Sequence, residues 1–169
     1  MRRNPGFMAT LAACAAVLLC PFCMVTCINA QREVPVLPAA TTSIEGNPLV
    51  FSIDGSIKIV VLDFFTSWCV PCAVEARALE TVYRQRVGSD VAIVGVDVRE
   101  DRLKAKSFAT AQGITFPVIL DDGQVQKQYK AYSFPILVIV NLRTGKSERL
   151  EGWKSNLSRQ IAFAVKDVR

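Results

Sequence analysis

The apolar run from Ile57 to Phe65 is the feature that most constrains the fold of this 169-residue chain. Its residues are almost all β-branched, aliphatic or aromatic, and only Lys58 and Asp63 interrupt it. Such a run is typical of a central β-strand that is covered on both faces. A helical pattern begins shortly afterwards, near Ala73, so the sequence predicts a buried strand that leads directly into a helix.

The rest of the chain continues this alternation. Three further apolar runs have the length and composition of strands: residues 91–98, 116–120 and 136–141. The last of them is followed by a predicted hairpin turn at Arg143–Lys146, an edge strand at Ser147–Gly152 and a helix at Ser155–Val168. Helical patterns separate the other strands, and together these elements predict a three-layer α/β domain.

The helix after Pro71 has an amphipathic pattern, and proline is favoured in a first helical turn. Val74 and Leu79 belong to the stripe that we expect to face the core. Glu75 and Glu80 are expected to face solvent on the opposite side.

The first 30 residues have the layout of an export signal. Arg2 and Arg3 precede an apolar run from Phe7 to Ile28, and Ala30 supplies a small residue at a cleavage point. Three alternatives stay open: a cleaved signal peptide, an uncleaved membrane anchor, and lipid attachment at Cys14. Each places the folded part in an oxidising, extracytoplasmic compartment, which we expect to be the periplasm, either in solution or tethered by this segment. We assign residues 1–30 to the signal or anchor, 31–47 to a linker and 48–169 to the folded domain.

Composition argues against several functions. The formal charge is +5, but Lys and Arg form no cluster interleaved with aromatic residues, so we expect no binding to nucleic acid. The chain contains no histidine, which excludes Ser–His and Cys–His nucleophiles and most zinc and copper sites. We therefore expect neither a metal nor a cofactor.

Of the six cysteines, only Cys69 and Cys72 lie beyond the export segment. A structural zinc ion needs about four ligands, which disfavours a metal site. A purely structural disulfide is the other alternative, but so short a loop contributes only about 2 kcal/mol. The position favours a redox-active pair, because the N–H groups and dipole at a helix N-terminus stabilise a thiolate. Cys69 is then the nucleophile, and Cys72 is the resolving thiol.

Asp63 is the polar residue of interest outside this pair. An ionised carboxylate inside an apolar strand is costly, so burial is expected to raise its pKa. In the alternative interpretation, strand alternation turns Asp63 towards solvent or into a salt bridge.

The run from Val61 to Cys72, which contains Trp68-Cys69-Val70-Pro71-Cys72, resembles the active-site strand and helix start of the thioredoxin superfamily. Residues 91–97 and 108–117 resemble the extracytoplasmic TlpA/ResA-type branch. The resemblance covers residues 44–168 and makes residues 48–169 a thioredoxin-like domain. It implies a central mixed sheet flanked by helices, with an inserted strand–helix unit and a terminal β-hairpin plus helix.

The resemblance also implies roles for individual residues. Phe134–Pro135 matches the cis-proline loop, which faces the cysteines and lines the substrate groove. Trp68 and Pro71 belong to the same groove, where Trp68 shields the disulfide. Asp63 matches the acid that relays a proton to or from the second cysteine, Cys72.

We therefore predict an exported thiol–disulfide oxidoreductase that acts on protein thiols and disulfides. Val70–Pro71 holds neither a histidine nor a cation, which favours a disulfide reductase supplied by a membrane electron donor. Cytochrome c maturation is the leading role that the resemblance implies. The alternatives are a disulfide-forming oxidase or isomerase, and a binding module of the same fold without turnover.

Overall fold

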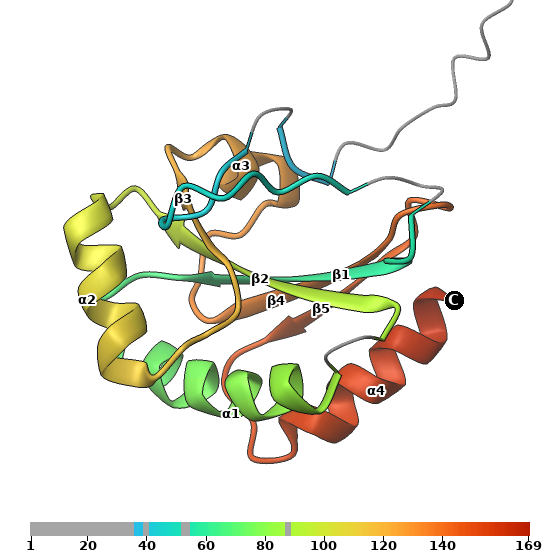
Figure 1. The fold of residues 1–169 in the computed structure, drawn as a ribbon. Helices are drawn as coiled ribbons and strands as arrows, with labels where there is room; N and C mark the ends of the chain where they lie inside the picture. The colour runs from blue at the N-terminus through green and yellow to red at the C-terminus, as the bar shows by residue number, and fades with distance from the viewer. Residues whose placement is uncertain (1–35, 39–40, 52–54, 87–88) are drawn as a thin grey trace, which may run out of the picture. The chain divides into compact units, whose positions relative to one another are not determined.

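The structure is a computed structural model, and it describes residues 36–38, 41–51, 55–86 and 89–169 (Figure 1). The predicted signal or anchor segment, residues 1–30, lies outside the described residues. Within the described ranges, no helix combines the length and the apolar character needed to cross a membrane.

Five strands form one mixed sheet in the order β3–β2–β1–β4–β5. The strands are β1 (Ile59–Phe65), β2 (Val91–Val98), β3 (Val118–Asp121), β4 (Ile136–Asn141) and β5 (Ser147–Glu151). β1 is central because it pairs in parallel with β2 and antiparallel with β4. β4 and β5 form the predicted terminal hairpin, so the α/β fold with a mixed sheet is confirmed.

Helices cover both faces of this sheet, which gives three layers (Figure 1). The helices are α1 (Val70–Arg86), α2 (Arg102–Gln112), α3 (Gln124–Tyr129) and α4 (Leu157–Val168). Buried residues of α1, α2 and α4 share one core cluster with the sheet, and α3 contributes to the cluster on the other face. The strand and helix predicted between residues 91 and 117 correspond to β2 and α2.

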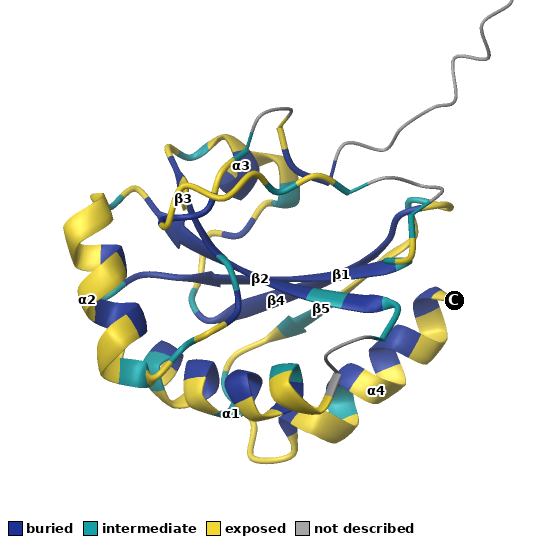
Figure 2. Cartoon of the chain, viewed as in Figure 1, coloured by how far each residue is buried: buried dark blue, intermediate teal, exposed yellow. Residues whose placement is uncertain are grey.

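Strand β1 is buried along its whole length, as its apolar sequence predicts (Figure 2). Side chains alternate between the two faces of a strand. Val61 and Phe65 therefore enter the core beneath α1, whereas Leu62 and Phe64 enter the opposite core. By the same alternation Asp63 lies on the face that α1 covers.

The folded unit extends further towards the N-terminus than predicted. Val36 and Leu37 are buried, and Ile44 is only 1% exposed within the core beneath α1. Ser43 forms a β-bridge with Ile119, and the Ile44 N–H donates to the Val118 carbonyl at 2.7 Å. The described part of the predicted linker therefore packs against the domain, because Val36, Leu37 and Ile44 supply core contacts.

The orientation predicted for α1 was wrong at two acidic residues and at Val74, which is 36% exposed although it was expected to face the core. Glu75 is 2% exposed and Glu80 is 6% exposed, although both were expected to face solvent. The buried stripe of this helix starts at Cys72 and continues through Ala76 and Leu79, and Glu75 lies on the same face. The carboxylate of Glu75 is thus buried one helical turn after Cys72.

Candidate active site at the start of helix α1

The two cysteines form a disulfide where β1 gives way to α1. Cys69 directly precedes α1, and its carbonyl accepts a backbone bond from Ala73 at 3.2 Å, as expected of an N-cap residue. The Cys72 N–H donates to Cys69 Sγ at 3.2 Å. A thiolate at Cys69 would receive this N–H bond and would lie at the positive end of the helix dipole.

The loop before β4 contains a cis peptide bond between Phe134 and Pro135, as predicted. The register of the sheet explains its position. Ile136, the next residue, pairs with Phe64 near the carboxyl end of β1. The cis-proline loop therefore lies at the end of the sheet from which the Cys69 loop leaves.

A groove of about 450 Å³ opens beside the disulfide loop, and we call it the Trp68 groove. Trp68, Tyr132 and Phe134 supply its aromatic lining. Trp68 is 73% exposed and Tyr132 is 66% exposed, so both rings present apolar area to a partner. Of the residues predicted for a substrate groove, Trp68 and Phe134 line it, whereas Pro71 and Pro135 do not.

Asp63 and Glu75 form a buried acidic pair on the α1 side of the sheet. Asp63 is 1% exposed, and neither carboxyl oxygen has a hydrogen-bond partner among the described residues. Burial raises the pKa of Asp63 to about 7, which agrees with the predicted direction. Burial, and then the charge of Asp63, raises the pKa of Glu75 to about 8. At neutral pH the pair therefore holds a proton, because two carboxylates cannot both ionise cheaply there.

Sequence reasoning missed Glu75, although its spacing carried a signal. Glu75 follows Cys72 by three residues, and residues three apart share a helix face. Cys72 is buried in the core beneath α1, and Glu75 faces the same side.

A second acidic pair consists of Asp97, near the end of β2, and Glu100, in the turn that follows this strand. Asp97 is fully buried, and burial, followed by the charge of Glu100, raises its pKa to about 8. The sequence pattern that indicates a buried acid at Asp97 is the same as at Asp63, a lone carboxylate in an apolar strand. Glu100 accepts hydrogen bonds from the N–H and the hydroxyl of Ser67. It therefore ties the turn before α2 to the loop that carries Trp68 and Cys69.

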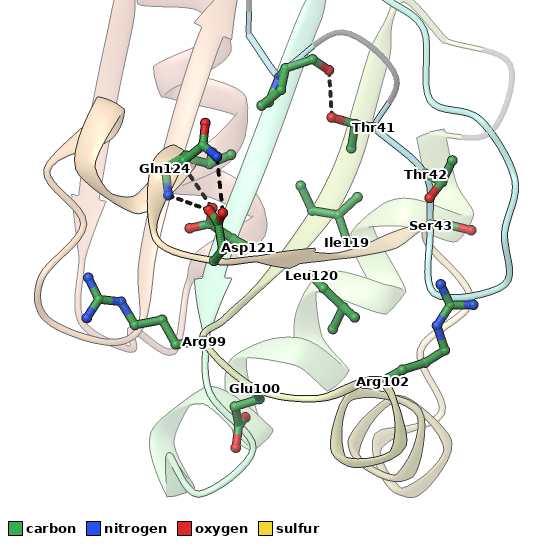
Figure 3. Close-up of a pocket in the computed structure, with 13 residues that line it drawn as sticks. Thr41, Thr42, Ser43, Arg99, Glu100, Arg102, Ile119, Leu120, Asp121 and Gln124 are labelled. Carbon is green, nitrogen blue, oxygen red and sulfur yellow. Dashed lines mark hydrogen bonds between the residues drawn. The ribbon is translucent and has the colours of Figure 1, made fainter.

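Another cavity of about 450 Å³ lies between residues 41–43 and β3 (Figure 3). Neither cysteine lines it. Arg99, in the turn before α2, and Arg102, the first residue of α2, point in different directions (Figure 3). Arg102 donates to the Ile44 carbonyl at 3.1 Å, so it holds the N-terminal segment rather than a ligand.

Comparison with curated proteins supports the chemistry of this site. The chain is 29% identical over 119 residues to sporulation thiol-disulfide oxidoreductase A of Bacillus subtilis, which covers 67% of this chain and 71% of that protein. It is 34% identical over 85 residues to thiol-disulfide oxidoreductase ResA of the same organism, covering 50% of this chain. It spans about half the length of this ResA, 48%.

Solved structures agree on the fold. The structure of StoA from Bacillus subtilis superposes with a TM-score of 0.61 at 27% identity, covering 75% of this chain and 96% of that one. A secreted Mycobacterium tuberculosis disulfide oxidoreductase, described as homologous to Escherichia coli DsbE, gives a TM-score of 0.61 at 25% identity, with 75% and 93% covered. The family model described as AhpC/TSA matches residues 17–145. The chain therefore belongs to the AhpC/TSA family, and within it resembles the thiol–disulfide oxidoreductases of the ResA/StoA type.

Proposed function

We propose that the chain is an exported thiol–disulfide oxidoreductase that works as a disulfide reductase, with Cys69 as nucleophile and Cys72 as resolving thiol. One observation carries this proposal above the others. The Cys69–Cys72 disulfide occupies the N-terminus of α1, where a backbone N–H already donates to Cys69 Sγ. An N–H donor in this position lowers the pKa of a thiol, which increases the thiolate fraction near neutral pH.

In the first step the Cys69 thiolate of the reduced protein attacks one sulfur of a substrate disulfide. The substrate S–S bond breaks, a mixed disulfide forms, and the departing substrate sulfur takes up a proton. In the second step the Cys72 thiolate attacks Cys69 Sγ and releases the second substrate thiol. Two electrons pass to the substrate, and the protein is left with the Cys69–Cys72 disulfide.

The second step needs a base for the Cys72 thiol, because Cys72 is only 1% exposed. Asp63 and Glu75 lie on the same side of the sheet, and their raised pKa values leave one of them able to accept a proton near neutral pH. Asp63 is proposed as the relay, with Glu75 as the partner that sets its proton affinity. No histidine is present to serve instead.

The surface that binds the substrate protein is proposed to lie along the cis-proline loop. Phe134–Pro135 reaches the end of β1 beside the Cys69 loop, and Trp68 lines the adjacent groove. Pro71 contributes by opening α1, which is where the disulfide is held. Protein thiols and disulfides are the proposed partners.

We propose that the protein is exported and that it works in the reducing direction. A relative is described as secreted, and the N-terminal sequence has the layout of an export signal. A reductant in an oxidising compartment needs electrons from across the membrane, so a membrane electron donor is a proposed partner. Haem attachment in cytochrome c maturation requires reduced cysteines, and it is the proposed process.

Turbidimetric reduction of insulin by the dithiol form tests the activity. Wild-type protein should reduce insulin with dithiothreitol as electron source, whereas Cys69→Ser should be inactive. Cys72→Ser should accumulate mixed disulfides on Cys69, because the first step proceeds without the second. A reduced, folded wild-type protein that leaves insulin untouched would instead support a binding module. A potential well above that of glutathione would support the oxidase.

A further inference from the structure

Arg149 of β5 forms hydrogen bonds to two consecutive carbonyl groups at the end of α3. Its Nη1 donates to the Tyr129 carbonyl at 2.8 Å, and its Nη2 donates to the Lys130 carbonyl at 3.0 Å. The last carbonyls of a helix have no partner within that helix, and a positive charge is favourable there. The planar guanidinium can bond to both oxygens at once, whereas a lysine ammonium acts as a single point charge. Arg149 therefore caps the C-terminus of α3 from the edge strand.

The Lys130 carbonyl links Arg149 to the loop that precedes β4. It also accepts a hydrogen bond from the Tyr132 N–H at 3.2 Å, so Arg149 bonds to the same oxygen that holds the backbone of Tyr132. Lys130 has a φ of +53°, and it turns the chain out of α3 and into this loop. Tyr132 and Phe134, which both belong to the loop, line the Trp68 groove. A side chain outside the groove thus contacts the start of a segment that forms its wall.

The far end of the same loop is also attached to the β5 side of the sheet. The N–H of Gly152, the residue after β5, donates to the Pro135 carbonyl at 3.0 Å. Arg149 pairs with Val138 of β4, and Val138 belongs to the core cluster to which α3 contributes. Because paired residues share a face of the sheet, this register directs the Arg149 side chain towards α3. The edge strand therefore holds the loop near both of its ends.

The two carbonyl bonds are the important contacts of Arg149. Its Nε also lies 3.1 Å from Oε1 of Glu151, but the Glu151 side chain is 61% exposed, and such an ion pair contributes little stability. The position of α3 does not depend on Arg149 alone. Gln126 donates from Nε2 to the Ala131 carbonyl at 3.1 Å, and the Ala131 N–H donates to the Gln126 carbonyl at 2.9 Å. A variant without the guanidinium should therefore still fold.

We propose that Arg149 is a positioning residue for substrate binding, because it holds Tyr132 and Phe134 in the arrangement that a partner protein contacts. This inference rests on the proposed function and adds to it a residue of the edge strand. Arg149 does not line the groove, so it acts through the Lys130 carbonyl rather than by touching the substrate. A loop that is already ordered loses less conformational freedom when a partner binds, which favours affinity. A small disulfide that reaches only the cysteines gains nothing from this order.

Two substrates separate positioning from chemistry. The reduced protein is mixed in stopped flow with a peptide that contains one internal disulfide, or with hydroxyethyl disulfide, which is small and uncharged. Arg149→Met keeps the length of the side chain but removes its donors, and it should raise the half-saturating peptide concentration roughly 5-fold or more. The limiting rate with the peptide and the rate with hydroxyethyl disulfide should stay within about 2-fold of the wild-type values. Arg149→Lys should have an intermediate effect, because lysine lacks the planar pair of donors.

Hydrogen exchange of the Tyr132 amide provides a measurement that does not depend on activity. In Arg149→Met this amide should exchange at least about 10-fold faster, because the carbonyl that accepts its hydrogen bond is no longer held. The Gly152 amide, at the other attachment of the loop, should exchange as in the wild-type protein.

Two control variants isolate the carbonyl bonds. Glu151→Ala removes the ion pair and leaves both carbonyl bonds of Arg149 in place. Arg143→Met makes the matched substitution at an exposed arginine in the turn between β4 and β5. Both variants should bind the peptide as the wild-type protein does.

Unchanged peptide binding in a folded Arg149→Met variant would overturn the inference. An equal loss of rate with the peptide and with hydroxyethyl disulfide would also overturn it, because the effect would then lie at the cysteines. If Arg149→Met does not fold, a wild-type half-saturating concentration in Arg149→Lys would overturn it. Failure of the wild-type protein to reduce hydroxyethyl disulfide would instead overturn the proposed reductase activity, and exchange at Tyr132 would still test the Arg149 contact.

Discussion

Glu100 accepts hydrogen bonds from both donors of Ser67, the backbone N–H and, at 2.8 Å, the hydroxyl. The two residues are 33 positions apart, and they connect the turn before α2 to the loop before α1. Bonds to a charged acceptor are stronger than bonds between neutral groups. The contact therefore fixes the loop that presents Trp68 and Cys69 to a partner.

Variants that remove one side of this contact should lower the free energy of unfolding by different amounts. Glu100→Ala is expected to reduce the free energy of unfolding by about 2–3 kcal/mol, because it deletes both bonds, and Ser67→Ala by about 1 kcal/mol. Urea denaturation of the oxidised protein measures both values, and the double variant gives the coupling energy. Glu148→Ala, at an exposed residue of β5, is the matched control and should change little. Additive losses from Glu100→Ala and Ser67→Ala would contradict the contact.

Asp63→Asn should slow the second chemical step while the fold is retained. Asparagine has a similar shape but cannot accept the Cys72 proton, and general base catalysis commonly contributes about 10²-fold or more. Stopped-flow measurement of mixed-disulfide resolution should show a decrease of at least about 10-fold near neutral pH. Asp90→Asn, at a residue paired with Arg169, is the control. An unchanged rate in Asp63→Asn would reject Asp63 as the relay.

The buried acidic pair should make the oxidised protein less stable as pH rises. The unfolded-state pKa values are about 3.9 for Asp and about 4.3 for Glu, whereas the folded values of Asp63 and Glu75 are raised to about 7 and about 8. Between these limits the folded state binds more protons than the unfolded state, so the free energy of unfolding falls with pH.

Urea denaturation at a series of pH values from about 5 to about 8 checks this sign. The wild-type protein should lose stability across the range, at up to about 1.4 kcal/mol for each pH unit and each group. Asp63→Asn should make the slope smaller, because asparagine does not titrate, whereas Glu75 and Asp97 still do. A stability that rises across this range in the wild-type protein would show that both carboxylates are satisfied in the folded state.

Trp68→Ala should weaken binding of substrate proteins with little effect on folding. Trp68 is 73% exposed, so its removal should change the free energy of unfolding by less than about 0.5 kcal/mol. A buried aromatic anchor at an interface contributes about 1–2 kcal/mol, so KM for a peptide disulfide should rise roughly 5- to 30-fold. Phe163→Ala, at an aromatic residue of α4 that is 66% exposed, is the control and should leave KM unchanged. A KM that rises equally in both variants would contradict a specific role for Trp68 in substrate binding.

Much of the fold was predictable because local patterns and tertiary packing agree. The apolar run at 57–65 forms the central strand. Asp101 is the N-cap of α2, because its side chain accepts a hydrogen bond from the Lys104 backbone N–H. The sequence also predicts the cysteine pair and the cis-proline bond correctly, because the motif and its context are specific.

The acidic residues of α1 were not predictable in the same way. Glu80 is buried because its carboxylate accepts from Thr115 at 2.7 Å and from Arg84 at 2.7 Å, and Thr115 lies 35 residues away. No local pattern contains such a partner. Glu75 is buried next to Asp63, and its Oε1 has no hydrogen-bond partner within the described part of the chain. A rule that places charged side chains on the surface does not predict such a position.

The N-terminal segment at Thr42–Pro48 has a consequence for self-association. The outer edge of β3 would otherwise present unpaired backbone groups, and exposed edges recruit strands from other molecules. Ser43 and Ile44 occupy that edge through the bridge to Ile119 and the bond to the Val118 carbonyl. A truncated chain that begins after Pro48 would expose the β3 edge to strand addition. This short stretch is therefore expected to limit aggregation.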